Sequence, residues 1–167
     1  MKKLSGIKTR FCQVCYTIMQ LKTGDKAPAF SAKNQDGKNL SLTDFAGKKL
    51  VLYFYPKDDT PGCTAEACSL RDNYETLQKQ GFAIVGVSPD GESKHLKFIA
   101  KYELPFDLLA DTDNSIALAY GVWVEKSMYG RKYMGIARTT FIIDEHGNIA
   151  EIIEKVDTAK HATQILK

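Results

Sequence analysis

Short apolar runs alternate with segments of helical periodicity from Leu21 onward. The runs at residues 49–55 and 82–87 are too short for buried helices and are rich in β-branched and aromatic side chains, which predicts buried strands. In residues 92–102, the apolar side chains fall on one face of a helix and the lysines on the other. In all, we expect strands at 49–55, 82–87, 107–110, 139–143 and 148–154, and helices at 60–79, 92–102, 114–120 and 158–166.

A β-hairpin is predicted ahead of the first long strand. Residues 29–32 and 39–42 flank an Asp-Gly pair at residues 36–37, a frequent turn dipeptide in hairpins. A second turn at residues 144–147 separates the last two predicted strands. Strands that alternate with helices and end in a hairpin predict a mixed α/β sheet that is covered on both faces.

The length of 167 residues fits one ordinary domain with a single sizeable core. A composition of 44% hydrophobic and 26% charged residues excludes a disordered or low-complexity chain. No linker or internal repeat divides the sequence. We expect residues 1–20 to form a flexible extension and residues 21–167 to form the domain.

The net charge of +3 is unevenly distributed along the chain. Five of the 23 basic residues precede the first acidic residue, Asp25, which leaves 18 basic against 20 acidic side chains in the remainder. This pattern lacks the clustered basic surface of a nucleic-acid binder. Arg10 and Gln13 interrupt any signal-peptide core, and no run is long enough to span a membrane. We expect a cytoplasmic protein; organellar targeting by the basic N-terminus and a natural start near Met19 stay open as alternatives.

The four cysteines form two pairs, Cys12 with Cys15 and Cys63 with Cys68. Four cysteines are too few to stabilise a chain of this length by disulfides, so their spacing points to reactive thiols or to a metal site. The three histidines lie at no ligand spacing, and we therefore expect no metal. Because nothing before Cys12 resembles a strand, we interpret the first pair as incidental rather than as a thioredoxin-type redox motif.

The segment before Cys63 predicts a reactive thiol. Thr60 is a candidate N-cap and Pro61 fits the first helical position, so Cys63 lies in the first turn of a helix that follows a buried strand. Free backbone N–H groups and the helix dipole favour a thiolate there. The alternative is a buried, inert cysteine. The neighbouring acids Asp58 and Asp59 are interpreted as part of a solvated loop.

The distance between Cys63 and Cys68 restricts any disulfide between them. Five residues along a helix are about 140° apart in rotation and about 7.5 Å in rise, which separates the two Cα atoms by roughly 8.5 Å. A disulfide requires a separation below about 7 Å. If the two cysteines form a redox pair, the first turns of the helix must therefore unwind.

These residues resemble a known family. Pro56-x-x-x-Thr60-x-x-Cys63 resembles the peroxidatic motif of peroxiredoxins, and the continuation to Ala67-Cys68 resembles the peroxiredoxin Q subgroup, also called bacterioferritin comigratory protein. The resemblance extends over about residues 21–167 and includes Arg138 with its neighbours. The first 18 residues, with their two cysteines, depart from the family pattern.

The resemblance implies a thioredoxin-like fold with an added N-terminal hairpin. It also implies reduction of hydrogen peroxide and alkyl hydroperoxides without a metal, haem or flavin. By position, Cys63 is the peroxidatic thiolate and Cys68 the resolving thiol. Thr60 would hold the thiolate and orient the peroxide, and Pro56 would shield the pocket from water. Arg138 would supply a permanent positive charge, although without the resemblance an arginine before a strand is typical of a surface residue.

The implied cycle is that of an antioxidant enzyme. Cys63 becomes a sulfenic acid, Cys68 condenses with it to a disulfide, and thioredoxin, or alternatively glutaredoxin, reduces that disulfide. We expect a monomer because no large apolar surface is evident. Two rival interpretations are a thiol–disulfide oxidoreductase, which gives no reason for Thr60 and Arg138, and a zinc-binding interaction module built on the four cysteines.

Overall fold

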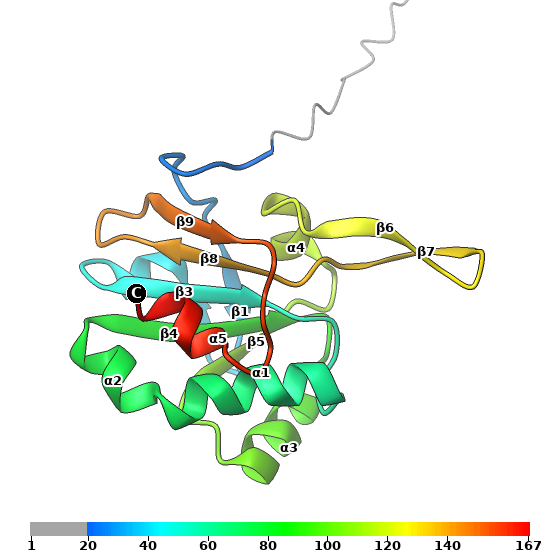
Figure 1. Ribbon diagram of the computed structural model, residues 1–167, viewed down its shortest axis with the longest axis horizontal. Helices are drawn as coiled ribbons and strands as arrows, with labels where there is room; N and C mark the ends of the chain where they lie inside the picture. The colour runs from blue at the N-terminus through cyan, green and yellow to red at the C-terminus, as the bar shows by residue number, and fades with distance from the viewer. Residues whose placement is uncertain (1–19) are drawn as a thin grey trace, which may run out of the picture.

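A five-stranded mixed sheet forms the centre of the computed structural model, which describes residues 20–167 (Figure 1). Its strands are β3 (Lys49–Phe54), β4 (Phe82–Ser88), β5 (Asp107–Ala110), β8 (Thr139–Ile143) and β9 (Ile149–Ile153). They lie in the order β5-β4-β3-β8-β9. β3, β4 and β5 run parallel, whereas β8 runs antiparallel to both of its neighbours. β3 is therefore a central strand that is paired along both edges.

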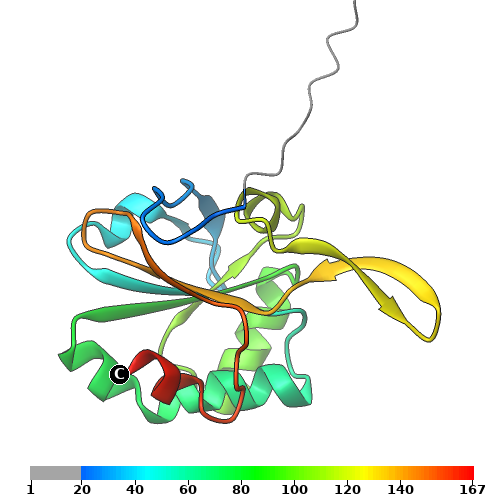
Figure 2. The same ribbon diagram turned by 45° about the horizontal axis from the view of Figure 1, so that its top comes forward.

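The helices cover both faces of this sheet. They are α1 (Pro61–Asp72), α2 (Tyr74–Lys79), α3 (Glu92–Tyr102), α4 (Ser115–Ala119) and α5 (His161–Ile165). α1, α2, α3 and α5 lie on one face and α4 on the other (Figure 2). Side chains alternate along each strand, so Leu52 and Phe54 of β3 enter the core on the α4 side, while Tyr53 enters the core beneath α1. The predicted mixed α/β sheet is thus confirmed.

The predicted N-terminal hairpin is also present. β1 (Ser31–Lys33) and β2 (Asn39–Ser41) pair antiparallel around the Asp-Gly turn. A short 3-10 helix, η1 (Leu42–Phe45), then leads into β3. The hairpin packs on the α4 side of the sheet, away from the face that carries α1 (Figure 2).

The prediction of one continuous helix over residues 60–79 was wrong. The structure has two helices, α1 and α2, separated at Asn73. The amide Nδ2 of Asn73 donates to the carbonyl of Ser69 at 2.9 Å. An asparagine side chain that competes in this way for a helix carbonyl favours a helix end over a helix interior.

A second hairpin, between α4 and β8, was not predicted. It consists of β6 (Trp123–Met128) and β7 (Arg131–Ile136), and it projects from the body of the molecule (Figure 1). Most of its side chains are exposed or only half-buried. Because it has no buried apolar face, its sequence lacks the hydrophobic pattern that predicts a strand.

Some expectations fall outside the described part of the chain. Cys12, Cys15 and the alternative start at Met19 all precede residue 20. Within residues 20–167, no helix combines the length and the apolar character needed to cross a membrane.

Gly86 of β4 offers a test of how tightly the core beneath α1 is packed. A Cβ atom at this position would lie 2.6 Å from Leu108 and 2.8 Å from the ring of Tyr53. We expect Gly86→Ala to lower the free energy of unfolding by about 1–3 kcal/mol, because both neighbours are fully buried. Urea denaturation measures the effect. Gly135→Ala is the control, since its nearest contacts are at 3.4 Å; equal losses in both variants would contradict the packing argument.

Candidate active site

The site lies where β3 leads into α1. α1 begins as the sequence predicts, with Thr60 as the N-cap in extended conformation and Pro61 as the first helical residue. The carbonyl of Thr60 accepts the first helical hydrogen bond, from the backbone N–H of Thr64 at 2.8 Å. The free N–H groups of the first turn therefore lie at the carboxyl end of the central strand, where α/β folds bind ligands.

Cys63 occupies this first turn and is buried, with 1% of its surface exposed. The guanidinium Nη2 of Arg138 donates to its Sγ atom at 3.2 Å. Arg138 stands directly before β8, between β7 and the central sheet. A permanent positive charge and a helix N-terminus thus meet at one sulfur atom, and both stabilise negative charge beside it.

Gly62 leaves the room that the guanidinium needs. A Cβ atom at position 62 would lie 3.3 Å from Nη2 of Arg138, closer than the usual contact distance. The glycine before the cysteine therefore has a steric reason, which the sequence alone does not reveal.

Glu66 is a member of the site that the sequence analysis missed. Its side chain is completely buried, and its Oε2 atom forms an ion pair with Nη1 of Arg138. The same guanidinium therefore bridges Cys63 and Glu66. Burial raises the pKa of Glu66 to about 7, and Arg138 opposes this shift. The available signal was its position three residues after Cys63, on the same face of the helix.

The structure places the two remaining motif residues in the loop and at the helix start. The hydroxyl of Thr60 donates to the carbonyl of Lys57 at 3.0 Å and makes no capping bond to the helix. Its proton is thus engaged, and its oxygen retains lone pairs that can accept a hydrogen bond. Pro56 follows the last buried residue of the β3 segment, Tyr55, and is exposed.

Cys68 lies five residues after Cys63 within the continuous helix α1. Both thiols are free, Cys63 buried and Cys68 half-buried. The helical separation of roughly 8.5 Å between their Cα atoms exceeds what a disulfide can bridge. In this arrangement the two thiols lie out of range for a disulfide.

The loop before α1 is fixed by a buried polar network around Asp58. The hydroxyl of Tyr55 donates to Oδ1 of Asp58 at 2.6 Å, and Nδ1 of His95 lies 2.6 Å from Oδ2. The other ring nitrogen, Nε2, donates to the carbonyl of Leu109 at 3.0 Å. The interpretation of Asp58 as solvated was therefore wrong: it satisfies a tyrosine and a histidine in the core. Asp59 is exposed as expected and pairs with a lysine of α3.

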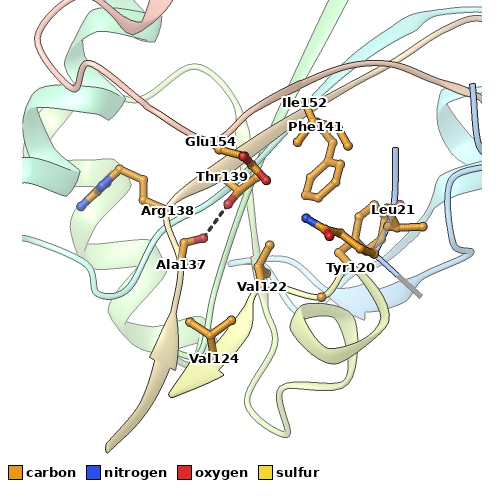
Figure 3. A pocket seen from close by; sticks show the side chains of 12 residues that line it. Leu21, Tyr120, Val122, Val124, Ala137, Arg138, Thr139, Phe141, Ile152 and Glu154 are labelled. Atoms are coloured by element: carbon orange, nitrogen blue, oxygen red, sulfur yellow. Dashed lines mark hydrogen bonds between the residues drawn. The ribbon is translucent and has the colours of Figure 1, made fainter. Parts of the chain in front are cut away.

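A cavity of about 420 Å³ shares one residue with the site but lies apart from Cys63. Its wall includes the apolar side chains of Val122, Val124, Phe141 and Ile152. Figure 3 shows the Arg138 side chain pointing away from the other lining residues. Because the guanidinium bonds Cys63, the reactive sulfur lies on the far side of Arg138 from this cavity.

The arrangement supports chemistry of a thiolate with an electrophile that develops negative charge. Nη2 of Arg138 and the free N–H groups of α1 can stabilise an anion beside Sγ of Cys63. Within residues 20–167, no three histidine, cysteine, aspartate or glutamate side chains gather in a way that could hold a metal ion.

Comparison with known sequences adds an independent line of evidence. Residues 23–152 match the model of the AhpC/TSA family. The putative peroxiredoxin bcp of Coxiella burnetii is 49% identical over 148 residues, which cover 89% of this chain and 98% of that protein. Peroxiredoxin Bcp of Bacillus subtilis is 45% identical over 149 residues, which cover 89% of this chain and 95% of that protein.

Solved structures show the same likeness. Peroxiredoxin Q of Xanthomonas campestris superposes with a TM-score of 0.78 at 38% identity, over 82% of this chain and 87% of that one. PrxQ of Xylella fastidiosa superposes with a TM-score of 0.82 at 31% identity, over 87% and 93% of the two chains. The thioredoxin-like fold implied by the sequence motifs is thereby confirmed.

Two neighbouring tyrosines provide a matched test of the loop network. Both are fully buried, but the hydroxyl of Tyr55 bonds Asp58, whereas that of Tyr53 has no hydrogen-bond partner among the described residues. We expect Tyr55→Phe to lower the free energy of unfolding by about 1–3 kcal/mol, because Asp58 loses a donor. Tyr53→Phe removes an unsatisfied polar group and is expected to be neutral or stabilising. Denaturant titration compares them, and equal destabilisation would contradict the network.

Proposed function

The chain belongs to the AhpC/TSA family as a thiol-dependent peroxidase, a peroxiredoxin, and we propose that Cys63 is its peroxidatic residue. The supporting observation is the bond between Nη2 of Arg138 and Sγ of Cys63 at the start of α1. A thiolate in this position attacks the nearer oxygen of a peroxide. The O–O bond breaks, the electron pair leaves with the distal oxygen, which takes up a proton, and Cys63 becomes a sulfenic acid.

Arg138 and Thr60 assist this step in different ways. The guanidinium of Arg138 beside Sγ stabilises the negative charge that grows on the distal oxygen. The hydroxyl of Thr60, whose proton is bonded to Lys57, is arranged to accept a hydrogen bond from the O–H of the peroxide. Its proposed role is therefore to orient the substrate. We also propose that Pro56, which is exposed in the loop before α1, shields the site from water.

Cys68 is the proposed resolving residue. Its thiol attacks the sulfenic sulfur of Cys63, a disulfide forms, and water leaves with the sulfenic oxygen. Ser69 accepts a hydrogen bond from the backbone N–H of Ala162 at 3.2 Å, and Arg71 donates to the carbonyl of Tyr102 at 2.7 Å. These contacts hold the second half of α1, so we infer that the first turns, with Cys63, unwind toward Cys68.

The substrates we propose are hydrogen peroxide and alkyl hydroperoxides. Alkyl peroxide reduction is described for the bacterioferritin comigratory protein of Xanthomonas campestris, which is 37% identical to this chain. Peroxiredoxins require a thiol reductant, and here we propose thioredoxin, with glutaredoxin as the alternative. We also propose a monomer in the cytoplasm.

Serine variants of the cysteines test these roles. Cys63→Ser is expected to abolish peroxide consumption, because an alcohol at this position is not ionised. Cys68→Ser is expected to reduce one equivalent of peroxide and then to turn over at least about tenfold more slowly with thioredoxin. A coupled assay with thioredoxin, thioredoxin reductase and NADPH measures both.

The matched control is the double variant Cys12→Ser/Cys15→Ser, which we expect to retain full turnover. Peroxide consumption by Cys63→Ser at the normal rate would refute the assignment. An insulin-reduction assay separates the peroxidase from a thiol–disulfide oxidoreductase: faster insulin reduction than peroxide reduction would favour the rival function.

Unwinding of α1 is tested by amide hydrogen exchange. In the protein oxidised with one equivalent of peroxide, we expect faster exchange in the first turns of α1 than in the reduced protein, because the disulfide cannot form on an intact helix. The amides of α3 provide the internal reference. A disulfide between Cys63 and Cys68, located by mass spectrometry, together with unchanged exchange throughout α1 would disprove the unwinding.

A further inference from the structure

One carboxylate oxygen beneath the site lacks a hydrogen-bond partner. Oε2 of Glu66 pairs with Arg138, but Oε1 is buried and accepts no hydrogen bond from any described residue. Burial of a carboxylate oxygen without a hydrogen-bond partner costs free energy, so we expect a donor close to it. The nearest candidate is His161 of α5, whose Nε2 atom lies 3.6 Å from Oε1.

His161 is itself completely buried and has no role in the steps described above. Its Nε2 atom lies 2.8 Å from the hydroxyl oxygen of Thr140 on β8. That hydroxyl can donate to a neutral imidazole or accept from a protonated one. Thr140 therefore supports either protonation state of Nε2, the nitrogen that faces Glu66.

The other ring nitrogen is fixed as a donor. Nδ1 of His161 lies 3.1 Å from Oε1 of Gln164. The orientation of the Gln164 amide follows from its two other bonds: Nε2 donates to the carbonyl of Lys155 at 3.0 Å, and Oε1 accepts from the backbone N–H of Asp157 at 2.9 Å. Nδ1 must then carry a hydrogen, so Nε2 is the only nitrogen of His161 that can gain or lose a proton.

Burial shifts the pKa values of Glu66 and His161 in opposite directions. Burial lowers the pKa of His161, and burial raises the pKa of Glu66 to about 7. Each group alone therefore favours its neutral form. Burial and the nearby Arg138 also lower the pKa of Lys126. The charged and titratable groups that act on Glu66 or His161 are Arg138 before β8, Tyr53 on β3 and Asp157 before α5. Cys63 on α1 and Lys126 on β6 act on Arg138 in turn.

We propose that Glu66 and His161 titrate as a coupled pair that holds one proton, on Oε1 of Glu66 or on Nε2 of His161, and that this pair is a positioning element that sets how much of the Arg138 charge acts on Cys63. With the proton, the pair is neutral overall, and the guanidinium acts fully on the thiolate and on the departing oxygen. Without it, the carboxylate of Glu66 offsets the charge of Arg138. The inference rests on the proposed function and adds a residue from the C-terminal helix to the site.

The pair itself is tested by NMR, independently of peroxide chemistry. The ring nitrogens of His161 are followed from pH 5 to 9 in the full-length reduced protein and in Glu66→Gln. We expect the Nε2 titration midpoint to fall by about one pH unit or more in the variant, because a carboxylate that favours the protonated ring is lost. The exposed His146 serves as the internal reference. An unchanged midpoint for His161 would overturn the shared proton.

The effect on Cys63 is tested by the pH profile of its reaction with hydrogen peroxide, measured in a single turnover. We expect the second-order rate constant to fall at the pH where the pair loses its proton, which gives the profile a descending limb. Glu66→Gln should remove this limb, and His161→Asn should move it to lower pH, because the proton then has one site instead of two. His146→Asn should leave the limb in place. A descending limb that persists unchanged in both variants would refute the role.

The two measurements separate this inference from the proposed function. If Cys63 does not react with peroxide in the unaltered protein, the peroxidase assignment fails, whereas the NMR result still decides whether the pair exists. If the midpoint of His161 shifts but the pH profile does not, the proton is shared without influence on Cys63, and the positioning role is rejected.

Discussion

The guanidinium of Arg138 links the start of α1 to the central sheet, and the geometry of the site depends on this link. Arg138 precedes β8, β8 pairs with β3, and β3 leads directly into α1. The bonds from the guanidinium to Cys63 and Glu66 therefore connect α1 back to the start of β8, so that β3, α1 and β8 hold one another in place. Gly62 belongs to the same constraint, because a Cβ atom at this position would lie 3.3 Å from Nη2 and the guanidinium would have to shift slightly.

The helix that activates Cys63 also prevents its disulfide with Cys68. While α1 is intact, its first turn offers free N–H groups to the thiolate and keeps the two sulfur atoms apart. In the proposed cycle, α1 is intact while Cys63 reacts with peroxide and is partly unwound while the disulfide forms. The contacts of Ser69 and Arg71 to other elements favour unwinding of the first turns over the rest of the helix. Such unwinding would separate Cys63 from Arg138, so the step that permits the disulfide would also break the contact that stabilises the thiolate.

The sequence predicted the elements whose side chains have a regular apolar pattern. The buried strand before Cys63, the helix start at Thr60 and the N-terminal hairpin all follow from local rules. The hairpin β6–β7 was missed because most of its side chains are exposed or only half-buried, and the helix break at Asn73 depends on one side-chain bond. The periodicity of apolar residues cannot reveal the hairpin or the helix break, because neither feature depends on a buried apolar face.

The site was predictable only as far as its residues are close in sequence. Cys63 and Thr60 lie in one turn, whereas Arg138 is 75 residues from Cys63 and was identified through a family resemblance. Glu66, His161 and Asp58 are polar residues in the core, and each has at least one partner that is distant in the sequence. Charged residues of these types usually lie at the surface, so only the folded structure shows that these three are buried and paired.

Burial of the Glu66 carboxylate beside Arg138 costs desolvation free energy, and the stability of the fold does not by itself account for the ion pair. Replacing a buried ion pair by apolar groups of similar volume is often neutral or stabilising, by about 1–4 kcal/mol. With an apolar residue in place of Glu66, however, nothing on α1 besides Cys63 would direct the guanidinium, and its full charge would rest on the thiolate at every pH. A carboxylate shared with His161 keeps Arg138 in place while its own charge depends on one proton. The net charge of +3 over the whole chain therefore carries little information about the charge at Cys63, to which the ion pair of Arg138 and Glu66 contributes directly.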